Sequence, residues 1–255
     1  MARADRAPMA AHVAAVVPCK DEADRIGATV AAVRSLPQVG RVVVVDDGSS
    51  DDTAERAREA GADVVCHPRN RGKAAALETG VARVRALERE ESAAREDAPG
   101  TAHPAPLLFV DGDLAGTAVS LGVLTEPVLA GEAEMTIATL PAQITAGGGR
   151  GFVVRLARGG IQRLTGFSPV QPLSGMRCLA PVAYEAASPL APGWGVETAL
   201  TVDVLRAGLR VLEVPCELQH RVSGRDWRGQ VHRAEQYRDV WRALVRRGWR
   251  PWQRG

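Results

Sequence analysis

Two pairs of aspartates, each directly after a run of apolar residues, are the side chains in this sequence best suited to bind a ligand. Val42–Val45 precedes Asp46 and Asp47, and Leu107–Val110 precedes Asp111-Gly112-Asp113. A β-branched apolar run is typical of a buried parallel strand, and open α/β sheets bind ligands at the carboxyl ends of their strands. Carboxylates there can hold a divalent cation, which can in turn hold a diphosphate. The pattern favours an enzyme that handles a nucleotide diphosphate with metal help.

A third group of residues could contact phosphate. Arg69-Asn70-Arg71-Gly72-Lys73-Ala74 places a Gly-Lys pair at the expected start of a helix, where free backbone N–H groups and a cation suit an anion. The GxxxxGK[ST] frame of a Walker motif is absent. The alternative is a helix cap followed by a solvated lysine.

The elements that would position these residues alternate along the chain. Strands are expected at 12–17, 41–45, 62–66, 107–110, 134–140 and 210–214, and helices at 24–36, from the Ser49–Ser50 cap to Gly61, at 72–88 and at 227–248. Asp51 and Asp52 are expected in the first turn of the second helix. This β-α-β-α order predicts an α/β fold with a Rossmann-like, mostly parallel sheet, flanking helices and a C-terminal amphipathic helix.

The chain is long enough for one large domain with a small extension. We expect a flexible tail at 1–11, an α/β domain at 12–226, and a basic helix and tail at 227–255. Within the domain, the polar, proline-bearing segment 88–106 is expected to be an exposed insertion. The glycine-rich segment 141–151 is expected to be a mobile loop.

Composition excludes several classes of protein. Hydrophobic residues make up 45% and charged residues 24%, which is ordinary for a globular protein, and a net charge of +2 favours no partner class. The four cysteines are far apart, as in proteins with reduced cytosolic thiols. We find no transmembrane run, no secretory signal and no nucleic-acid-binding module, so we expect a cytoplasmic protein without a nucleic-acid partner.

Taken in order, these motifs resemble the nucleotide-binding half of the GT-A glycosyltransferases, in particular glycosyltransferase family 2. The segment from Val16 to Glu22 resembles a VVPxxNE-like first strand, with Asp21 in place of the usual Asn, and the segment from Val42 to Thr53 resembles VVDDGSxDxT. The resemblance implies the GT-A (nucleotide-diphospho-sugar transferase) fold and hexose transfer from a UDP- or GDP-linked sugar. The residues implied in donor binding are Pro18, Glu22, Asp46, Asp47, Lys73, Asp111, Gly112, Asp113 and, from the segment described next, Gly175.

The C-terminal half carries a narrower resemblance. Gln171-Pro172-Leu173-Ser174-Gly175, then Ala191 to Glu197, then Leu218-Gln219-His220-Arg221 are similar to segments of the glucosyl-3-phosphoglycerate synthases and their mannosyl relatives. The resemblance implies that Gly175 lies against the donor sugar and Glu197 near the acceptor. It also implies that Asp111, Asp113 and His220 coordinate Mg²⁺ or Mn²⁺, with His232 as the competing histidine. Met176 departs from the family's glutamate.

The sequence says less about the acceptor and the catalytic groups than about the residues that bind the donor and the metal. Arg150 could meet an acceptor phosphate, and the leading acceptor is a small phosphorylated or carboxylated metabolite. Family 2 enzymes invert the anomeric centre, in which case Glu197 or Asp203 could act as general base. The phosphoglycerate enzymes retain it, and no carboxylate nucleophile is obvious for that reaction.

Three other functions stay open. The basic C-terminal helix, with Trp241, could lie on an anionic membrane at its inner face and serve a polyprenyl-phosphate acceptor, as in the related dolichyl-phosphate mannose synthases, or it could pack on the domain. A nucleotidyltransferase would carry a Gly-rich Arg/Lys loop after the first strand, which is absent. A non-catalytic nucleotide-binding protein would have the same fold.

Overall fold

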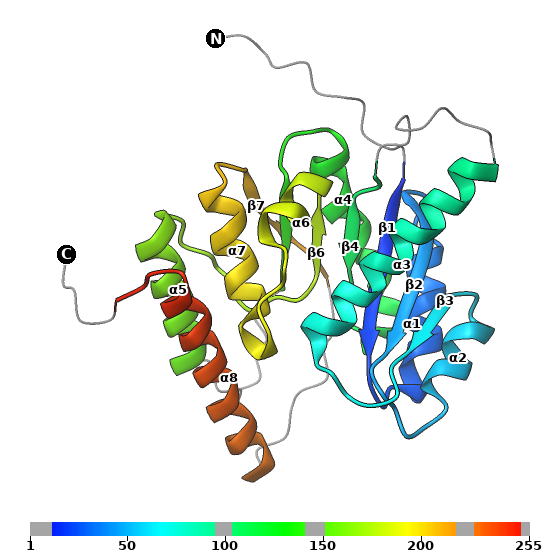
Figure 1. Ribbon diagram of the computed structural model, residues 1–255, viewed down its shortest axis with the longest axis horizontal. Coiled ribbons are helices and arrows are strands. Elements are labelled where there is room, and N and C mark those ends of the chain that lie inside the picture. Colours follow the sequence, from blue (N-terminus) through cyan, green and yellow to red (C-terminus); the bar gives the residue numbers. More distant parts are fainter. Residues whose placement is uncertain (1–11, 95–103, 141–150, 218–226, 251–255) are drawn as a thin grey trace.

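The sheet predicted from the apolar runs is present in the computed structural model, which describes residues 12–94, 104–140, 151–217 and 227–250, with side chains omitted for 227–233 (Figure 1). Seven strands lie in the order β3-β2-β1-β4-β6-β5-β7. They are β1 (Val13–Cys19), β2 (Val39–Asp46), β3 (Asp63–Cys66), β4 (Leu107–Phe109), β5 (Met135–Thr139), β6 (Arg177–Leu179) and β7 (Val211–Pro215).

One strand in the middle of the sheet runs against the others. β6 pairs antiparallel with β4 on one side and with β5 on the other, whereas the remaining pairs are parallel. The sequence did not predict β6, which has only three residues. Its insertion brings the segment before Arg177 beside the carboxyl end of β4, where the second aspartate motif, Asp111-Gly112-Asp113, was expected to bind a ligand.

Helices cover both faces of the sheet. They are α1 (Ala23–Arg34), α2 (Thr53–Glu59), α3 (Lys73–Ala94), the 3₁₀ turn η1 (Ala115–Leu121), α4 (Gly122–Leu129), α5 (Phe152–Thr165), α6 (Pro181–Ala187), the 3₁₀ turn η2 (Gly193–Gly195), α7 (Val196–Arg206) and α8 (Trp227–Arg246). One apolar core joins the sheet to α1, α2, η1 and α4. A second joins its other face to α3, α6 and α7, so β1 is buried on both faces as a central parallel strand should be.

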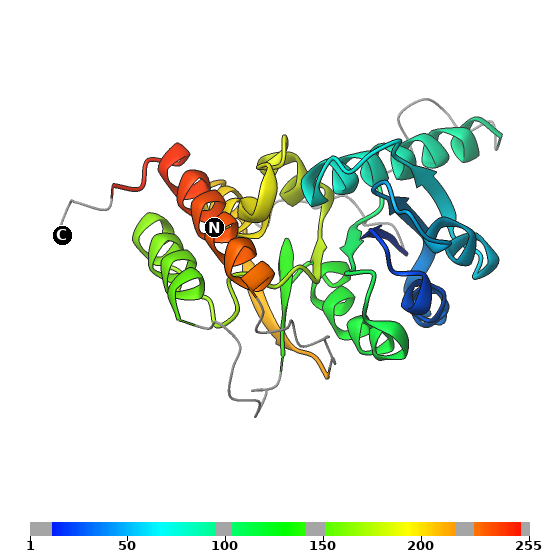
Figure 2. The ribbon, with the colours of Figure 1, turned by 90° about the horizontal axis from the view of Figure 1, so that it is seen from below.

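The C-terminal helix packs on the domain. Val240 and Leu244 of α8 are buried in a third apolar cluster with α5 and α7, and Ala243 of α8 is buried as well. α5 and α8 lie side by side at one end of the molecule (Figure 2). A Cβ added to Gly160 of α5 would lie 2.3 Å from Leu244 Cδ1, so the two helices approach closely because Gly160 has no side chain. Of the described helices, none has the length and apolar character needed to cross a membrane.

The expected start of the second helix was wrong. Ser49 and Ser50 do not cap it, because α2 begins at Thr53 after Asp52. Ser49 instead donates its backbone N–H to Asp46, and Asp51 accepts hydrogen bonds from the backbone N–H groups of Ala23 (3.2 Å) and Thr53 (3.1 Å). These polar side chains connect the loop after β2 to the loop after β1.

The expected insertion begins as regular structure. α3 continues to Ala94, so the first part of 88–106 is helical rather than an exposed loop. Glu88 accepts hydrogen bonds from Arg85 and from the backbone N–H of Ala105 (2.9 Å), which holds the returning chain against the helix. Residues 95–103 lie outside the described residues, as does the expected mobile loop 141–151 except for Gly151, which immediately precedes α5.

Candidate functional site

Four predicted site residues from four segments meet at the carboxyl end of β4. Lys73 begins α3, Asp111 follows β4, Gly175 precedes β6, and Glu197 lies in the first turn of α7. Lys73 Nζ is 2.7 Å from Asp111 Oδ1 and 3.0 Å from Glu197 Oε1. A Cβ added to Gly175 would lie 2.3 Å from Lys73 Nζ and 2.7 Å from Asp111 Oδ1. We call Lys73, Asp111, Gly175 and Glu197 the donor cluster, because donor binding is the role that the sequence predicts for the first three.

The charges of the donor cluster keep Lys73 protonated. Burial alone would lower the pKa of Lys73, but the carboxylates of Asp111 and Glu197 outweigh it and hold the pKa above its ordinary value. The cluster therefore carries one fixed positive charge between two carboxylates. An ammonium group at the start of a helix can turn to a phosphate oxygen without changing its protonation state.

The turn before Lys73 is shaped by a buried aspartate. Asp47 accepts hydrogen bonds from the backbone N–H groups of Arg71 (2.8 Å) and Gly72 (2.7 Å), and its Oδ1 lies 2.7 Å from His67 Nδ1. Both Asp47 oxygens are thus used within the protein. These contacts let Asp47 position the turn before Lys73, and its contact with the donor stays a prediction.

Sequence reasoning missed His67. It is buried on the chain segment after β3, and its Nε2 lies 3.0 Å from Thr79 Oγ1 of α3. His67 connects Asp47 to α3 and so helps to fix the start of that helix. Its position directly after an apolar strand was the available signal.

Asp46 stays at the end of β2, next to β1. It is buried, its Oδ1 accepts from Ser49 N (2.9 Å) and Ser49 Oγ, and it pairs in register with Cys19. The pKa of the Cys19 thiol is raised mainly by burial and further by the charge of Asp46, so the thiol is unreactive at neutral pH. Pro18 lies on β1 one residue earlier, and Glu22 is the N-cap residue of α1.

The loop after β4 is held by α1. Thr29 Oγ1 donates to Gly112 O (2.9 Å), and Arg25 Nη1 donates to Asp113 O (3.2 Å). A Cβ added to Gly112 would lie 2.8 Å from Cys19 Cβ, so only glycine fits between the two aspartates. This packing fixes the backbone that carries Asp111 and Asp113.

The predicted metal site is described only in part. Asp111 and Asp113 supply carboxylate oxygens, which suit Mg²⁺ and Mn²⁺. No three His, Cys, Asp or Glu side chains gather as a metal site within the described parts of the chain. His220, the predicted third ligand, lies outside the described residues, and so does the predicted acceptor residue Arg150.

A buried arginine under the site was also missed. Arg177 of β6 is 1% exposed, and it donates to Ser174 O (2.8 Å), Thr201 Oγ1 (2.8 Å) and Pro172 O (3.3 Å). Burial lowers its pKa to about 10, so it remains charged at neutral pH. Arg177 holds the backbone that places Gly175 in the donor cluster. The signal was an arginine inside the apolar stretch Met176–Ala180.

Asp203 lies elsewhere. It is on α7, but its carboxylate pairs with Arg247 at the end of α8, with Arg247 Nε 2.7 Å from Asp203 Oδ1. The structure does not bring Asp203 to the donor cluster. Its role as a general base therefore stays a prediction that this placement does not support, and Glu197 is the predicted base that the cluster contains.

Known proteins that are similar to this chain include glycosyltransferases. Residues 14–86 match the family model described as glycosyl transferase family 2. The chain is 32% identical over 225 residues to glucosyl-3-phosphoglycerate synthase from Mycolicibacterium paratuberculosis, covering 77% of this chain and 61% of that protein. It is 40% identical over 75 residues to the succinoglycan biosynthesis protein ExoU from Rhizobium meliloti, covering 28% of this chain and 22% of that protein.

Solved structures extend the likeness over most of the fold. The crystal structure of glucosyl-3-phosphoglycerate synthase from Mycobacterium tuberculosis with Mn²⁺, UDP and phosphoglyceric acid matches with a TM-score of 0.69 and 26% identity, over 92% of this chain and 78% of that one. The chain spans at most 61% of the length of the curated relatives it matches. Residues 14–86 therefore match glycosyl transferase family 2, and the α/β architecture of the chain is the GT-A fold of its structural relatives.

Proposed function

We propose that this protein is a metal-dependent glycosyltransferase that moves a hexose from UDP to a small phosphorylated acceptor such as a phosphoglycerate. The observation that carries the proposal is the donor cluster. It joins a lysine, two carboxylates and a glycine at the sheet edge where α/β folds bind nucleotides. Relatives whose structures contain UDP, Mn²⁺ and phosphoglyceric acid support the choice of donor and acceptor class.

Lys73 is proposed to bind the donor diphosphate. Its ammonium group is held near Asp111 and Glu197 by contacts of 2.7 and 3.0 Å, and the turn before it is fixed through Asp47. A fixed cation favours the product side of the transfer, because negative charge grows on the diphosphate as the sugar leaves. The same interaction would bind the intact donor more weakly than the departing diphosphate.

Asp111, Asp113 and His220 are proposed to hold Mg²⁺ or Mn²⁺. When bound, such a cation supplies Lewis-acid neutralisation of the diphosphate. Asp111 also contacts Lys73, so its carboxylate would position both the divalent cation and the Lys73 ammonium group, the two positive charges proposed to face the donor.

Gly175 and Glu197 are proposed to face the sugar. Any side chain at Gly175 would overlap Lys73 and Asp111, so glycine leaves room there for the hexose ring. The buried Ser174 hydroxyl next to it has no hydrogen-bond partner among the residues that the structure describes, which suits it to a sugar hydroxyl. Glu197 is the carboxylate through which an acceptor hydroxyl could lose its proton if transfer inverts.

The polyprenyl-phosphate alternative gains no support from α8. That reading required apolar residues of α8 to face a membrane, whereas Val240, Ala243 and Leu244 pack against the domain. The nucleotidyltransferase alternative is disfavoured by the family match and by the missing loop after β1.

Thermal-shift titration tests the donor. UDP, GDP, ADP and CDP are each added with Mn²⁺ or with EDTA. A ligand at a hundredfold excess over Kd stabilises the native state by about 2.7 kcal/mol. We expect UDP with Mn²⁺ to raise Tm selectively, and we expect EDTA or Asp113→Ala to remove the shift. No shift with any nucleotide would overturn the proposal.

A further inference from the structure

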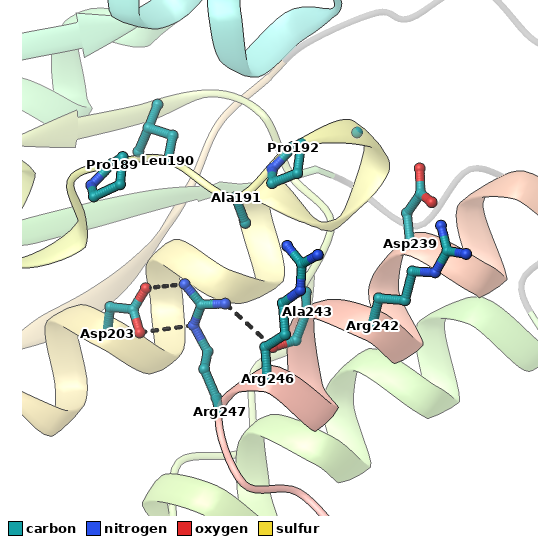
Figure 3. A pocket seen from close by; sticks show the side chains of 11 residues that line it. Pro189, Leu190, Ala191, Pro192, Asp203, Asp239, Arg242, Ala243, Arg246 and Arg247 are labelled. Carbon is teal, nitrogen blue, oxygen red and sulfur yellow. Dashed lines mark hydrogen bonds and ion pairs between the residues drawn. The ribbon is translucent and has the colours of Figure 1, made fainter.

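A second pocket lies away from the donor cluster. It has a volume of about 620 Å³ and lies between α8 and the loop 189–193 that joins α6 to η2 (Figure 3). No residue of the donor cluster lines it. Its volume is within the range of pockets that bind small molecules.

Both acidic residues of this pocket already have partners. Asp203 forms a two-pronged ion pair with Arg247. Asp239 accepts hydrogen bonds from Arg238 Nε (3.0 Å) and from the backbone N–H of Trp194 (3.3 Å). The charge left for a ligand is therefore positive.

That charge comes from Arg242 and Arg246. The side chain of Arg246 rises from α8 toward Pro192, and that of Arg242 extends to the side of Asp239 (Figure 3). Neither arginine forms a hydrogen bond or an ion pair with any residue that the structure describes. Like charges four residues apart on a helix repel each other. A shared anion would offset that repulsion, and the planar guanidinium group matches phosphate oxygens well.

The wall opposite the arginines is held in place before any ligand arrives. Leu190 is buried, and its backbone N–H donates to Glu78 Oε1 of α3 (2.8 Å). Pro189 and Pro192 restrict the backbone on either side. At the end of this wall, a Cβ on Gly195 would lie 2.6 Å from Asp239 O and 2.8 Å from Ala243 Cβ, so the wall is packed directly on α8.

We infer that this pocket binds a phosphate-bearing ligand, with Arg242 and Arg246 donating hydrogen bonds to the phosphate oxygens. The ligand is a phosphomonoester or a diphosphate, carried by a soluble metabolite or by a lipid headgroup. The inference does not depend on the proposed glycosyl transfer, because the pocket and the donor cluster share no residue.

Calorimetric titration with pyrophosphate in EDTA tests the site. Without a divalent cation, the donor cluster has two carboxylates around one lysine and does not attract this probe. The double variant Arg242→Gln/Arg246→Gln is expected to bind pyrophosphate about tenfold or more weakly, because it loses two charge-assisted contacts. The matched control is Arg89→Gln/Arg163→Gln. It makes the same charge change at exposed residues of α3 and α5 and should bind like the wild type.

Vesicle sedimentation identifies the source of the phosphate. Binding to vesicles that contain phosphatidic acid, whose headgroup is a phosphomonoester, assigns the pocket to a lipid headgroup if only the Arg242/Arg246 variant loses that binding. Pyrophosphate binding without vesicle binding assigns it to a soluble metabolite. The inference is overturned if the wild type binds neither probe, or if both double variants lose affinity equally. Melting curves check that each variant is folded.

Discussion

Replacing Lys73 with methionine should destabilise the protein in a pH-dependent way. Lys73 Nζ is 2.7 Å from Asp111 and 3.0 Å from Glu197, and the three side chains are 23%, 27% and 10% exposed. Removing one partner of a fully buried ion pair costs about 3–5 kcal/mol. Because solvent still reaches Lys73 and Asp111, we expect Lys73→Met to lower the free energy of unfolding by about 1–3 kcal/mol at pH 7.5.

The sign of the pH dependence follows from the two carboxylates left behind. Without the ammonium group they repel each other, so the folded-state pKa of one of them rises above its unfolded value of about 4. Stability from a raised pKa is present at low pH and is lost as pH rises through the folded pKa. The deficit of Lys73→Met relative to the wild type should therefore be largest at neutral pH and shrink toward pH 4.

Urea denaturation at pH 7.5, 6, 5 and 4 measures this difference. Lys20→Met is the matched control, because Lys20 is the other lysine of the chain and pairs with Asp21 on the surface. It should show little change and no added pH dependence. Equal stability of Lys73→Met and the wild type at every pH would refute the placement of Lys73 between two carboxylates.

Three further substitutions separate binding, positioning and stability. Gly175→Ala puts a Cβ 2.3 Å from Lys73 Nζ and should therefore weaken donor binding. In steady-state kinetics, KM for the sugar nucleotide should rise at least severalfold, and an unchanged KM would contradict the close packing at Gly175. Arg177→Met leaves three hydrogen-bond acceptors without their donor and should lower the free energy of unfolding, measured by urea denaturation, by about 2–4 kcal/mol. Arg177→Lys should recover part of this loss. If Arg177→Met were more stable than Arg177→Lys, the result would argue against the hydrogen-bonding role. Asp203→Asn breaks the ion pair with Arg247 and should lower the free energy of unfolding by about 1–2 kcal/mol without changing kcat; a large fall in kcat would return Asp203 to the list of catalytic residues.

The parts of the fold that sequence predicted are those set by local patterns. Val42–Val45 could only be a buried strand, and β2 contains it. The expected helix at 227–248 is α8. Its apolar periodicity predicts that Ala234 and Val245 lie on the buried side with Leu244, whereas Ala234 and Val245 are exposed and Val240 and Ala243 are buried. Apolar periodicity identified the helix but placed its buried face inexactly, because contacts with α5, α7 and η2 decide which residues of α8 are buried.

The parts that sequence could not predict depend on long-range contacts. β6 has three residues and is a strand because β4 and β5 flank it, so no local pattern marks it. Asp203 was a plausible base on its helix, but its partner Arg247 is 44 residues away. Asp47 has the residue type of a ligand contact, yet backbone N–H groups about 25 residues later use both its oxygens. In the donor cluster, residue types and motif order were sufficient to identify the members, but only the fold could show that they meet.

The most direct test of the account is a transfer assay with the purified protein, Mn²⁺, UDP-glucose and 3-phosphoglycerate, with the product identified by mass spectrometry. We expect a glucosylated phosphoglycerate that depends on metal, and we expect Glu197→Gln and Lys73→Met to lower its rate of formation by about tenfold or more while Arg89→Gln leaves the rate unchanged. Absence of glucosyl transfer with UDP-, GDP- or ADP-linked hexoses to any phosphorylated acceptor, by a protein that is folded and binds nucleotide, would contradict the central claim.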